Sequence, residues 1–597
     1  DTAGAARPAL RPAPRPQNPP LSFAQRRLWV LDQVEGPSPT YNIPITWRLS
    51  GPLDLAALRA AIGDVVARHE ALRTVFPAPG GEPVQRILDP AGVEIPFDLV
   101  EWSPTDGGAR PEPQPRDPHL ADVLARAASY PFDLGREVPV RVSVVRCSPR
   151  LHIVQVLLHH IAADEGSDRP LARDLSVAYR ARLAGTAPDW APLPVQYVDY
   201  ALWQRELLGD ESDAGSPAAA SREFWHDALA GLPAELALPT DRPRPDEPTH
   251  AGGAVETSIG ADLVAALRAV GRAHDASMFM VLRAAVATLL HRLGAGEDIA
   301  LGSPVSGRVD DVLDDLVGFF LNTLVLRTDL AGDPSFGELL GRVRAGDLAA
   351  FDHQDLPFDR VVDAVNPPRT LSRHPLFQVM IVYLAAFDAV DELDLAGVSA
   401  RPEPVRRGSV KFDLSIDFVE RGDDGGMTIG IAYSDDLFDR ASAIRLVERL
   451  PLLLAALTAD PTAPISVLEL TAAEERGVLL AAADTAGRRL PDLTWPAALA
   501  ARARRAPDAL AVATAAGTLT FAELVERGGR LARLLVERGV QREDVVAVAV
   551  PRSTDLAIAQ VAVLTAGAAC LPVDLADPAD DVAFVLADAG ARLLLST

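Results

Sequence analysis

The sequence is poor in cysteine and in long apolar runs. Its two cysteines, Cys147 and Cys570, lie far apart in apolar segments, so they provide neither a disulfide framework nor the ligand spacing of a metal site. No window approaches the roughly 18 uninterrupted apolar residues of a transmembrane helix, and the first residues lack the apolar core of a signal peptide. We therefore expect a protein of the reducing cytoplasm that binds no metal.

Positive charge is also scarce. The sequence has 82 acidic residues against 57 lysines and arginines, a net charge of −25, and few of the basic residues are lysines. Nucleic acids and anionic membranes are bound through clustered lysine and arginine, so neither is expected as the main partner. Apolar residues make up 48% of the chain, which is sufficient for sizeable cores. At roughly 150 residues per domain, the chain corresponds to about four domain-sized units.

Several familiar catalytic motifs are missing. The patterns G-x-S-x-G, G-x-x-x-x-G-K-[ST], G-x-G-x-x-G and H-E-x-x-H do not occur in the sequence. Neither cysteine lies in an obviously basic setting, so a thiolate nucleophile is not expected. These absences favour a reaction between two delivered reactants, in which the protein positions both and handles one proton.

A pair of histidines follows a run of strand-forming residues, in the stretch LHIVQVLLHHIAADEGS (151–167). Side chains alternate along a strand, so His159 and His160 are predicted to point in opposite directions. One of them can then face a cavity while the other is held within the structure. An isolated His-His pair is more often structural, and its meaning depends on the other motifs of the chain.

Strands and helices alternate along the chain, which indicates an α/β fold. The Pro/Ala/Arg segment 1–20 is predicted to be an extended linker, which implies an attached upstream partner domain. The apolar run 317–330 is predicted to be a buried strand. From about residue 495 a new series of strand, helix and strand begins and continues to Thr597.

Seven segments resemble, in order, the motifs of the condensation domain of nonribosomal peptide synthetases. Each alone is a weak signal, whereas seven in series over residues 21 to about 465 are very specific. They are LSFAQRRLW (21–29), RHEALRTVF (68–76), HHIAADEGS (159–167), YVDYALWQ (197–204), VGFFLNTLVLR (317–327), HQDLPFDR (353–360) and RTLSRHPLFQVM (369–380).

The resemblance implies two chloramphenicol-acetyltransferase-like lobes in a V-shaped pseudo-dimer, residues 21–190 and 191–465, with a tunnel between them. An upstream donor and a downstream acceptor peptidyl carrier domain would each deliver a thioester on a phosphopantetheine arm. The α-amine of the acceptor would attack the donor thioester and form a peptide bond. The chain itself would bind no cofactor and would act within a multimodular synthetase.

The resemblance also assigns the site. His160 would be the catalytic histidine facing the tunnel, while His159 and Asp164 would be mainly structural, with Asp164 paired to Arg308. The backbone amides around Gly166 and Ser167 would point at the reacting centre, as at a helix N-terminus. The full set of predicted site residues is His160, His159, Asp164 and Gly166, supported by Arg308, Ser167 and Asn322.

One position departs from the family pattern. Where the family usually has glycine after the aspartate, this sequence has Glu165, and glycine follows at position 166. A buried glutamate beside His160 would favour the imidazolium and weaken a general base, whereas an outward-facing one would change nothing. Two hypotheses therefore stand: an active condensation domain, and a catalytically silent docking module of the same fold.

Two segments, EGPSPTYNIP (35–44) and NPPRTLSRHPLFQVM (366–380), resemble the subclass that joins a D-configured donor to an L-configured acceptor. The three-histidine variant linked to β-lactam formation is not matched, because Leu158 precedes the pair.

The last part of the chain resembles the beginning of an adenylation domain. LTFAEL (519–524) and LTAGAACLPVD (564–574) are similar to its first two motifs, so we expect a linker at 466–490 and an incomplete α/β subdomain at 491–597. The phosphate loop, the amino-acid pocket and the catalytic lysine are not present in this stretch, so no amino-acid activation is expected from it. An unfinished parallel sheet would leave an open edge uncovered, which makes independent folding questionable.

Overall fold

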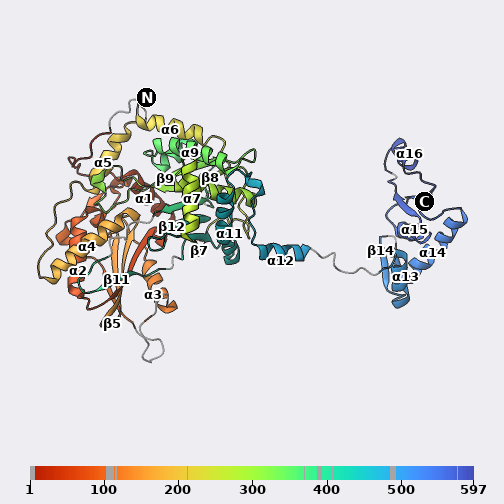
Figure 1. Cartoon of the computed structure of the whole chain (residues 1–597), viewed down its shortest axis with the longest axis horizontal. Coiled ribbons are helices and arrows are strands. Elements are labelled where there is room, and N and C mark those ends of the chain that lie inside the picture. Colours follow the sequence, from red (N-terminus) through yellow and green to blue (C-terminus); the bar gives the residue numbers. More distant parts are fainter. Residues whose placement is uncertain are drawn as a thin grey trace. The chain divides into compact units, whose positions relative to one another are not determined.

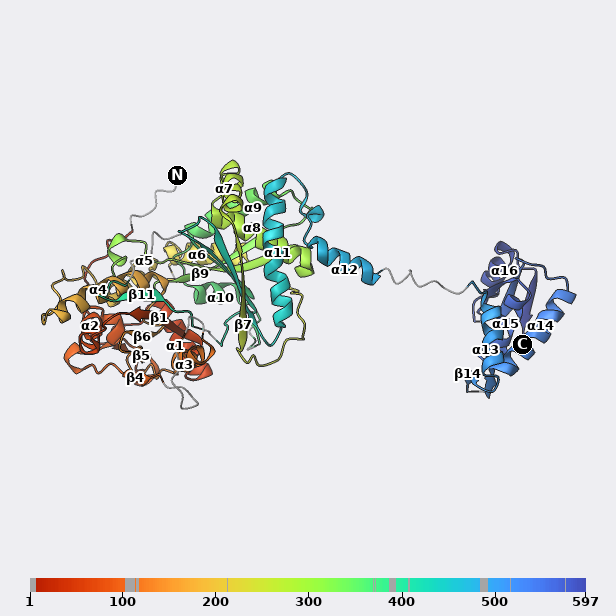
Figure 2. The ribbon, with the colours of Figure 1, turned by 60° about the horizontal axis from the view of Figure 1, so that its bottom comes forward.

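The computed structural model describes residues 7–102, 113, 117–211, 213–368, 370, 372–385, 393–405, 408–483, 492–515, 517–574 and 576–597 (Figure 1). The chain divides into two compact units, residues 1–472 and 473–597. The division falls inside the linker expected at 466–490, of which residues 484–490 lie outside the described residues. The first unit contains two lobes, each with its own sheet (Figure 2).

The first lobe is built on a five-stranded sheet with the order β11-β1-β6-β5-β4. The central strand β6 is buried along its whole length and runs antiparallel to both neighbours, β1 and β5. The strands are β1 (Asn42–Ser50), β4 (Phe97–Glu101), β5 (Val140–Ser148), β6 (Leu151–His159) and β11 (Ser399–Pro402).

Helices cover both faces of this sheet. Val154 and Val156 of β6 cluster with α2 (Leu55–Arg68) and α4 (Asp168–Leu183), whereas Ile153 packs against α3 (Pro118–Ala128). Helix α2 begins where the Asp54 side chain accepts the first free backbone N–H groups, and its apolar residues recur at helical spacing. The two sides of β6 therefore meet different surroundings, as the alternation of side chains requires.

The second lobe has a six-stranded mixed sheet with the order β7-β13-β12-β10-β8-β9, in which β10 runs parallel to β12 and β8. Its strands are β7 (Gly252–Ile259), β8 (Asp298–Val305), β9 (Asn322–Asp329), β10 (Val379–Leu384), β12 (Leu414–Glu420) and β13 (Met427–Ser434). Its helices are α6 (Pro217–Ala228), α7 (Ala261–Ala273), α8 (Met278–Leu290), α9 (Phe336–Asp352), α10 (Phe358–Val365) and α11 (Arg440–Ala459).

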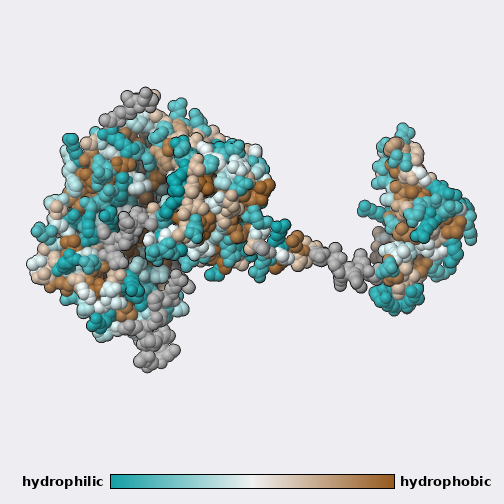
Figure 3. All heavy atoms as spheres, viewed as in Figure 1, coloured by the Kyte–Doolittle hydropathy of each residue, from teal (hydrophilic) through white to brown (hydrophobic). Residues whose placement is uncertain are grey.

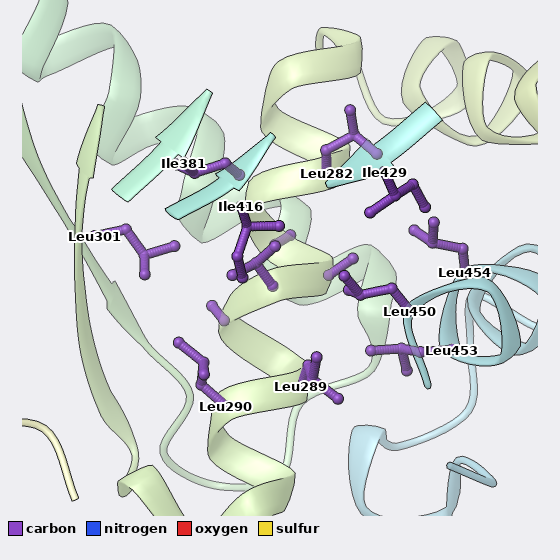
Figure 4. Packing of buried hydrophobic residues seen from close by; sticks show 14 of the residues in the cluster. Leu282, Leu289, Leu290, Leu301, Ile381, Ile416, Ile429, Leu450, Leu453 and Leu454 are labelled. Atoms are coloured by element: carbon purple, nitrogen blue, oxygen red, sulfur yellow. The ribbon is translucent and has the colours of Figure 1, made fainter. Parts of the chain in front are cut away.

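Helix α8 is the centre of the second lobe's core. Leu282 and Leu289 of α8 belong to one buried cluster with Ile429 of the sheet and Leu450 of α11 (Figure 4). The stretch Met278–Ala295 is long and apolar enough to cross a membrane by composition, and 67% of it is buried inside the protein. Its apolar character is explained by this packing, since a helix that is apolar on all sides is surrounded by other elements.

The structure adds one exchange between the lobes and corrects one predicted strand. Strand β11 belongs to the range expected for the second lobe, yet it pairs antiparallel with β1 of the first lobe, from Trp47↔Pro402 to Ser50↔Ser399. The strand expected over 317–330 is confined to β9, because side chains of the first lobe bind the backbone of 317–320 in place of a neighbouring strand.

Residues 7–20 contain no helix or strand, as expected of a proline-rich segment, but they pack against the rest of the first unit. Leu10 is only 7% exposed, in an apolar cluster with residues of α5 (Tyr197–Leu208) and with Leu313 of the second lobe. The Trp203 indole N–H donates to the Pro8 carbonyl at 2.6 Å, and Arg7 lies 2.6 Å from Asp355. We call residues 7–20 the strap.

The second unit has a parallel sheet of three short strands, in the order β17-β16-β18, and a two-stranded hairpin, β14-β15. Its strands are β14 (Leu510–Thr514), β15 (Gly517–Thr520), β16 (Val545–Ala549), β17 (Ala569–Pro572) and β18 (Leu593–Ser596). Its helices are α12 (Ala473–Ala483), α13 (Trp495–Arg505), α14 (Phe521–Glu537), α15 (Thr554–Thr565) and α16 (Ala579–Asp588).

Only the middle of this sheet is well covered. Strand β16 is buried against α14 and α15, whereas the outer strands are largely exposed and α16 has no buried residue. Phe584 is 67% exposed, and hydrophobic side chains are visible on the surface of the unit (Figure 3). The unit therefore has a small core of its own and the uncovered sheet edges that the sequence suggested.

Candidate active site

The end of strand β6 is held by its two neighbours. The His159 N–H donates to the Pro139 carbonyl beside β5 at 3.0 Å, and the His160 N–H donates to the Tyr41 carbonyl beside β1 at 2.8 Å. The two histidine rings then diverge, as the alternation along a strand predicts. The ring centroid of His159 lies 5.9 Å from that of Phe132, and the centroid of His160 lies 4.8 Å from that of Phe319.

His159 is enclosed within the first lobe. It is 4% exposed, and its Nδ1 accepts the Ile161 backbone N–H at 3.2 Å. Burial, with the positive charge of Lys411 acting in the same direction, lowers the pKa of His159 to about 3. The ring is therefore neutral at physiological pH and fixes the turn that follows the strand.

His160 lies at the junction of the two lobes and is partly exposed. Burial lowers its pKa well below the ordinary value, and Lys411 and His159 act in the same direction, whereas the carbonyls of His160 and Ala163 oppose them. Among the described residues its Nδ1 is buried without a hydrogen-bond partner. A neutral imidazole at this place can accept a proton, which an imidazolium cannot.

Residues 159–167, which we call the histidine loop, are connected to the second lobe by Asp164. Its carboxylate is 2% exposed and accepts the Phe320 N–H at 2.8 Å, the Ser167 hydroxyl at 2.9 Å and the Arg308 guanidinium at 2.9 Å. The expected pair of Asp164 and Arg308 is present. Arg308 also donates to the Leu316 carbonyl at 2.9 Å, so this ion pair holds two loops of the second lobe.

Gly166 and Ser167 have roles that differ from the expectation. The Ser167 N–H donates to the Asp164 carbonyl at 2.9 Å, so this amide closes the short turn η5 (Glu165–Ser167) and does not point at the reacting centre. A Cβ atom at position 166 would lie 2.6 Å from Arg308 Nε. Glycine is therefore needed at 166 because the guanidinium packs directly against its backbone.

Glu165 is exposed. Burial is the largest cause of the lowered pKa of His160. Glu165 is therefore not the buried glutamate that would favour the imidazolium form of His160.

Asn322 is not part of the histidine loop's hydrogen-bond network. Its amide donates to the carbonyls of Gln354 and Leu356, both at 2.8 Å, and its oxygen accepts the Phe358 N–H at 3.1 Å. It joins the start of β9 to the loop before α10. The structure thus brings His159, His160, Asp164, Gly166, Ser167 and Arg308 together and places Asn322 in a different network.

Two residues at this junction were not singled out from the sequence. Gln25, in helix α1 (Phe23–Glu35), donates to the Ile161 carbonyl at 3.1 Å and is fully buried. Phe319 packs its ring against His160. Gln25 lies in the motif at 21–29 and Phe319 in the motif at 317–327, so their membership of these motifs could have identified them. Within the described part of the chain, no group of three His, Cys, Asp or Glu side chains could hold a metal ion.

Comparison with protein families gives two matches. The condensation domain model matches residues 16–480, and the AMP-binding enzyme model matches residues 499–597. The first match covers more than half of the chain and includes every residue of the candidate site.

Curated relatives are synthetases of much greater length. The chain is 46% identical over 600 residues to a dimodular nonribosomal peptide synthase of Bacillus subtilis, covering 100% of this chain and 25% of that protein. It is 44% identical over 584 residues to an isonitrile lipopeptide synthase of Mycobacterium tuberculosis, covering 97% of this chain and 23% of that one. The chain thus spans about a quarter of the length of these relatives.

Solved structures agree on the fold. The X-domain from teicoplanin biosynthesis matches with a TM-score of 0.71 and 35% identity, over 78% of this chain and 100% of that one. A four-domain nonribosomal peptide synthetase bound to AMP and glycine matches with a TM-score of 0.82 over 98% of this chain and 43% of that one. At 22% identity the second match supports the fold only. The fold is therefore the predicted α/β arrangement with chloramphenicol-acetyltransferase-like lobes.

Proposed function

The chain belongs to the condensation-domain family of nonribosomal peptide synthetases, continued by part of an AMP-binding domain, and we propose that it joins two carrier-bound thioesters by a peptide bond. The α-amine of the acceptor aminoacyl thioester attacks the carbonyl carbon of the donor peptidyl thioester. The new C–N bond forms, the C–S bond breaks, and the proton lost by the amine ends on the donor's thiol.

The observation that carries this proposal is a neutral, partly exposed imidazole at the junction of the lobes. The lowered pKa of His160 keeps its ring unprotonated, and its backbone is fixed by the Tyr41 carbonyl. In the proposed step His160 accepts the proton of the attacking amine as the tetrahedral intermediate forms, or stabilises that intermediate. It then returns the proton to the leaving sulfur.

Positioning supplies most of the proposed rate enhancement. An α-amine has a pKa of about 7.7–8.0, so a useful fraction is already uncharged at physiological pH. Holding two tethered reactants in line is worth roughly 7–11 kcal/mol, whereas a general base contributes on the order of 10²–10⁴ in rate. The tie between Asp164 and Arg308 contributes to positioning because it joins the histidine loop to the second lobe.

The test is single-turnover peptide formation with donor and acceptor carriers loaded in advance. His160→Ala is expected to reduce the rate by roughly 10²–10⁴-fold, because the base is lost while carrier binding is retained. His226→Ala is the matched control, since His226 is an exposed histidine beside Asp227 on α6. Undiminished turnover by His160→Ala would contradict the proposed role.

A second candidate is a catalytically silent docking module. It is favoured by the similarity to the X-domain, which is also known in a complex with OxyB. In that case the wild-type chain would bind loaded carriers without forming peptide, and Glu165→Gly would produce activity. The exposed position of Glu165 argues against it, because water screens the charge of a solvent-exposed carboxylate.

Partners, cofactors and stereochemistry follow from the same proposal. The substrates arrive on the phosphopantetheine arms of an upstream and a downstream carrier domain, in the cytoplasm, and residues 491–597 do not activate an amino acid by themselves.

The preference for a D-configured donor is a prediction from segments 35–44 and 366–380, of which residues 369 and 371 lie outside the described residues. Competing D- and L-donors on the same carrier would test it.

A further inference from the structure

Phe319 packs its ring directly against the imidazole of His160. The two ring centroids lie 4.8 Å apart and the ring planes are inclined by 61°, an edge-to-face arrangement. Phe319 is partly exposed, whereas residues 316–318 and Phe320 are buried. The side chain of Phe319 therefore reaches the same junction between the lobes as the ring of His160.

The backbone on both sides of Phe319 is held by side chains of the first lobe. The Val317 N–H donates to His69 Nδ1 at 3.3 Å, and the Phe320 N–H donates to the Asp164 carboxylate at 2.8 Å. These four partners are buried, so water does not compete for the two bonds. The course of the backbone before and after Phe319 is therefore fixed.

Tyr197 and Ser167 bind the backbone of Phe319 and of the residue before it. The Tyr197 hydroxyl donates to the Phe319 carbonyl at 2.6 Å, and the Gly318 N–H donates to the Ser167 hydroxyl at 3.2 Å. A Cβ atom at position 318 would overlap the Tyr197 ring, so glycine permits this close approach. The ring of Phe319 is thus presented to His160 by a backbone that has little freedom to move.

Among the described residues, no hydrogen bond at Nδ1 orients the ring of His160. The carbonyl oxygens of His160 and Ala163 act to raise the pKa of this ring, but neither accepts a hydrogen bond from Nδ1. The carboxylate of the same loop, Asp164, is occupied by the three donors described above. The ring torsion of a histidine is broad by itself, so packing must select the orientation, and the contact with Phe319 supplies that packing.

We propose that Phe319 is a positioning residue of the condensation centre, whose ring keeps the imidazole of His160 oriented toward the acceptor's amine. The inference deepens the proposed function and rests on it. An aromatic ring here does by contact what a carboxylate does by hydrogen bonding in a catalytic triad. The proposal also gives a purpose to the bonds on residues 317–320, because they keep the ring in place while the proton is transferred.

The first test is single-turnover peptide formation with preloaded carriers. Phe319→Ala is expected to lower the maximal rate by roughly 10- to 100-fold, because a misoriented base loses part of its contribution. The carrier concentration at half-maximal rate should change by less than about twofold, since carrier binding does not depend on the orientation of the imidazole. Phe319→Tyr keeps the ring and should retain most of the rate.

Phe224→Ala is the matched control for this test. Phe224 is another partly exposed phenylalanine, and its ring stacks on that of His353 with the centroids 4.1 Å apart. It lies on α6 of the second lobe, so the variant removes a similar contact from a histidine that has no part in the proposed reaction. Its rate should match that of wild type.

A second measurement shows whether Phe319 acts through His160. In the His160→Ala background, Phe319→Ala is expected to change the residual rate by less than about twofold, because the group that it positions is absent. An equal loss in both backgrounds would overturn the inference, since the ring would then act independently of His160. An unimpaired Phe319→Ala chain would overturn it as well.

The third measurement reads the imidazole without substrate. In the full chain labelled at its histidine rings, the His160 signal is identified by its loss in His160→Ala. One narrow set of ring signals is expected for wild type and Phe319→Tyr, and a broadened or doubled set for Phe319→Leu, which keeps the bulk but not the planar ring. Equal line widths in the three folded chains would overturn the inference. Undiminished turnover by His160→Ala would overturn the proposed function, while the line widths would still test Phe319.

Discussion

The interior of the first lobe and the junction between the lobes give two neighbouring histidines different properties. His159 and His160 are both shifted toward the neutral form, so acidity does not distinguish them. His159 packs against Phe132 and its Nδ1 is occupied by the Ile161 N–H. His160 remains partly exposed beside Phe319. Access and hydrogen bonding, more than pKa, therefore separate a structural histidine from a candidate catalytic one.

The largest effect is expected where the junction is broken. Asp164→Ala leaves the Arg308 guanidinium buried without its carboxylate, which should lower the free energy of unfolding by roughly 3–5 kcal/mol. The loss is measured from the urea-induced unfolding transition of the first unit. Peptide formation should fall as well, because the histidine loop loses its tie to the second lobe.

The matched control is Asp98→Ala, whose carboxylate pairs with Arg141 at 3.2 Å and is 58% exposed. An exposed ion pair contributes at most about 1 kcal/mol. Equal losses in the two variants would mean that the buried pair does not hold the junction.

In the interior of the first lobe we expect a smaller effect, which acts on stability more than on peptide formation. His159→Leu leaves the buried Ile161 N–H without its acceptor, which should cost about 1–3 kcal/mol of unfolding free energy. Peptide formation should decline less than tenfold, since the ring of His160 is untouched. His160→Ala should show the reverse, with a large kinetic loss and little change in stability. A His159→Leu chain that is stable and inactive would contradict the comparison.

The interior also predicts how stability depends on pH. His159 and His374 both have a pKa of about 3 in the folded chain, below the ordinary value of 6.5. As the pH falls below 6.5 the unfolded chain binds these protons first, so stability is complete above 6.5 and is lost progressively toward pH 3. Each histidine contributes a slope of at most about 1.4 kcal/mol per pH unit. Urea titrations between pH 5 and 7 should give a shallower slope for His159→Leu than for wild type.

The smallest effect is expected at the position that departs from the family pattern. Glu165→Gly should change peptide formation by less than about twofold, because Glu165 is exposed and burial is the largest cause of the lowered pKa of His160. Gly166→Ala is the contrasting variant, since its Cβ would lie 2.6 Å from Arg308 Nε and must displace that side chain. A gain of several orders of magnitude in Glu165→Gly would instead support the docking module.

Local patterns predicted the features that depend on local rules. Alternation along β6 predicted the opposite directions of the two histidines, and the motif order predicted the α/β lobes and the pair of Asp164 and Arg308. The pairing of β11 with β1 was not predicted, because SARP (399–402) has no apolar alternation and gains its partner from a distant segment. The apolar letters of 317–321 resemble a strand, and only the first lobe's side chains make that segment a loop.

The strap shows a similar limit. Composition predicted an extended segment, and residues 7–20 are extended, yet composition does not reveal that Leu10 is buried. The Ser167 amide is a further case, because its use in a tight turn depends on the loop's closure by Asp164. Long-range pairing and loop closure depend on the assembled fold, so local sequence patterns do not predict them.

The strap also has a mechanical consequence. A force applied to the chain at residue 7 would act first on the Arg7–Asp355 contact in the second lobe and on the bond from Trp203 to Pro8 in α5. The load would thus reach both lobes before it reached the sheets, since Leu10 lies in the apolar cluster where they meet.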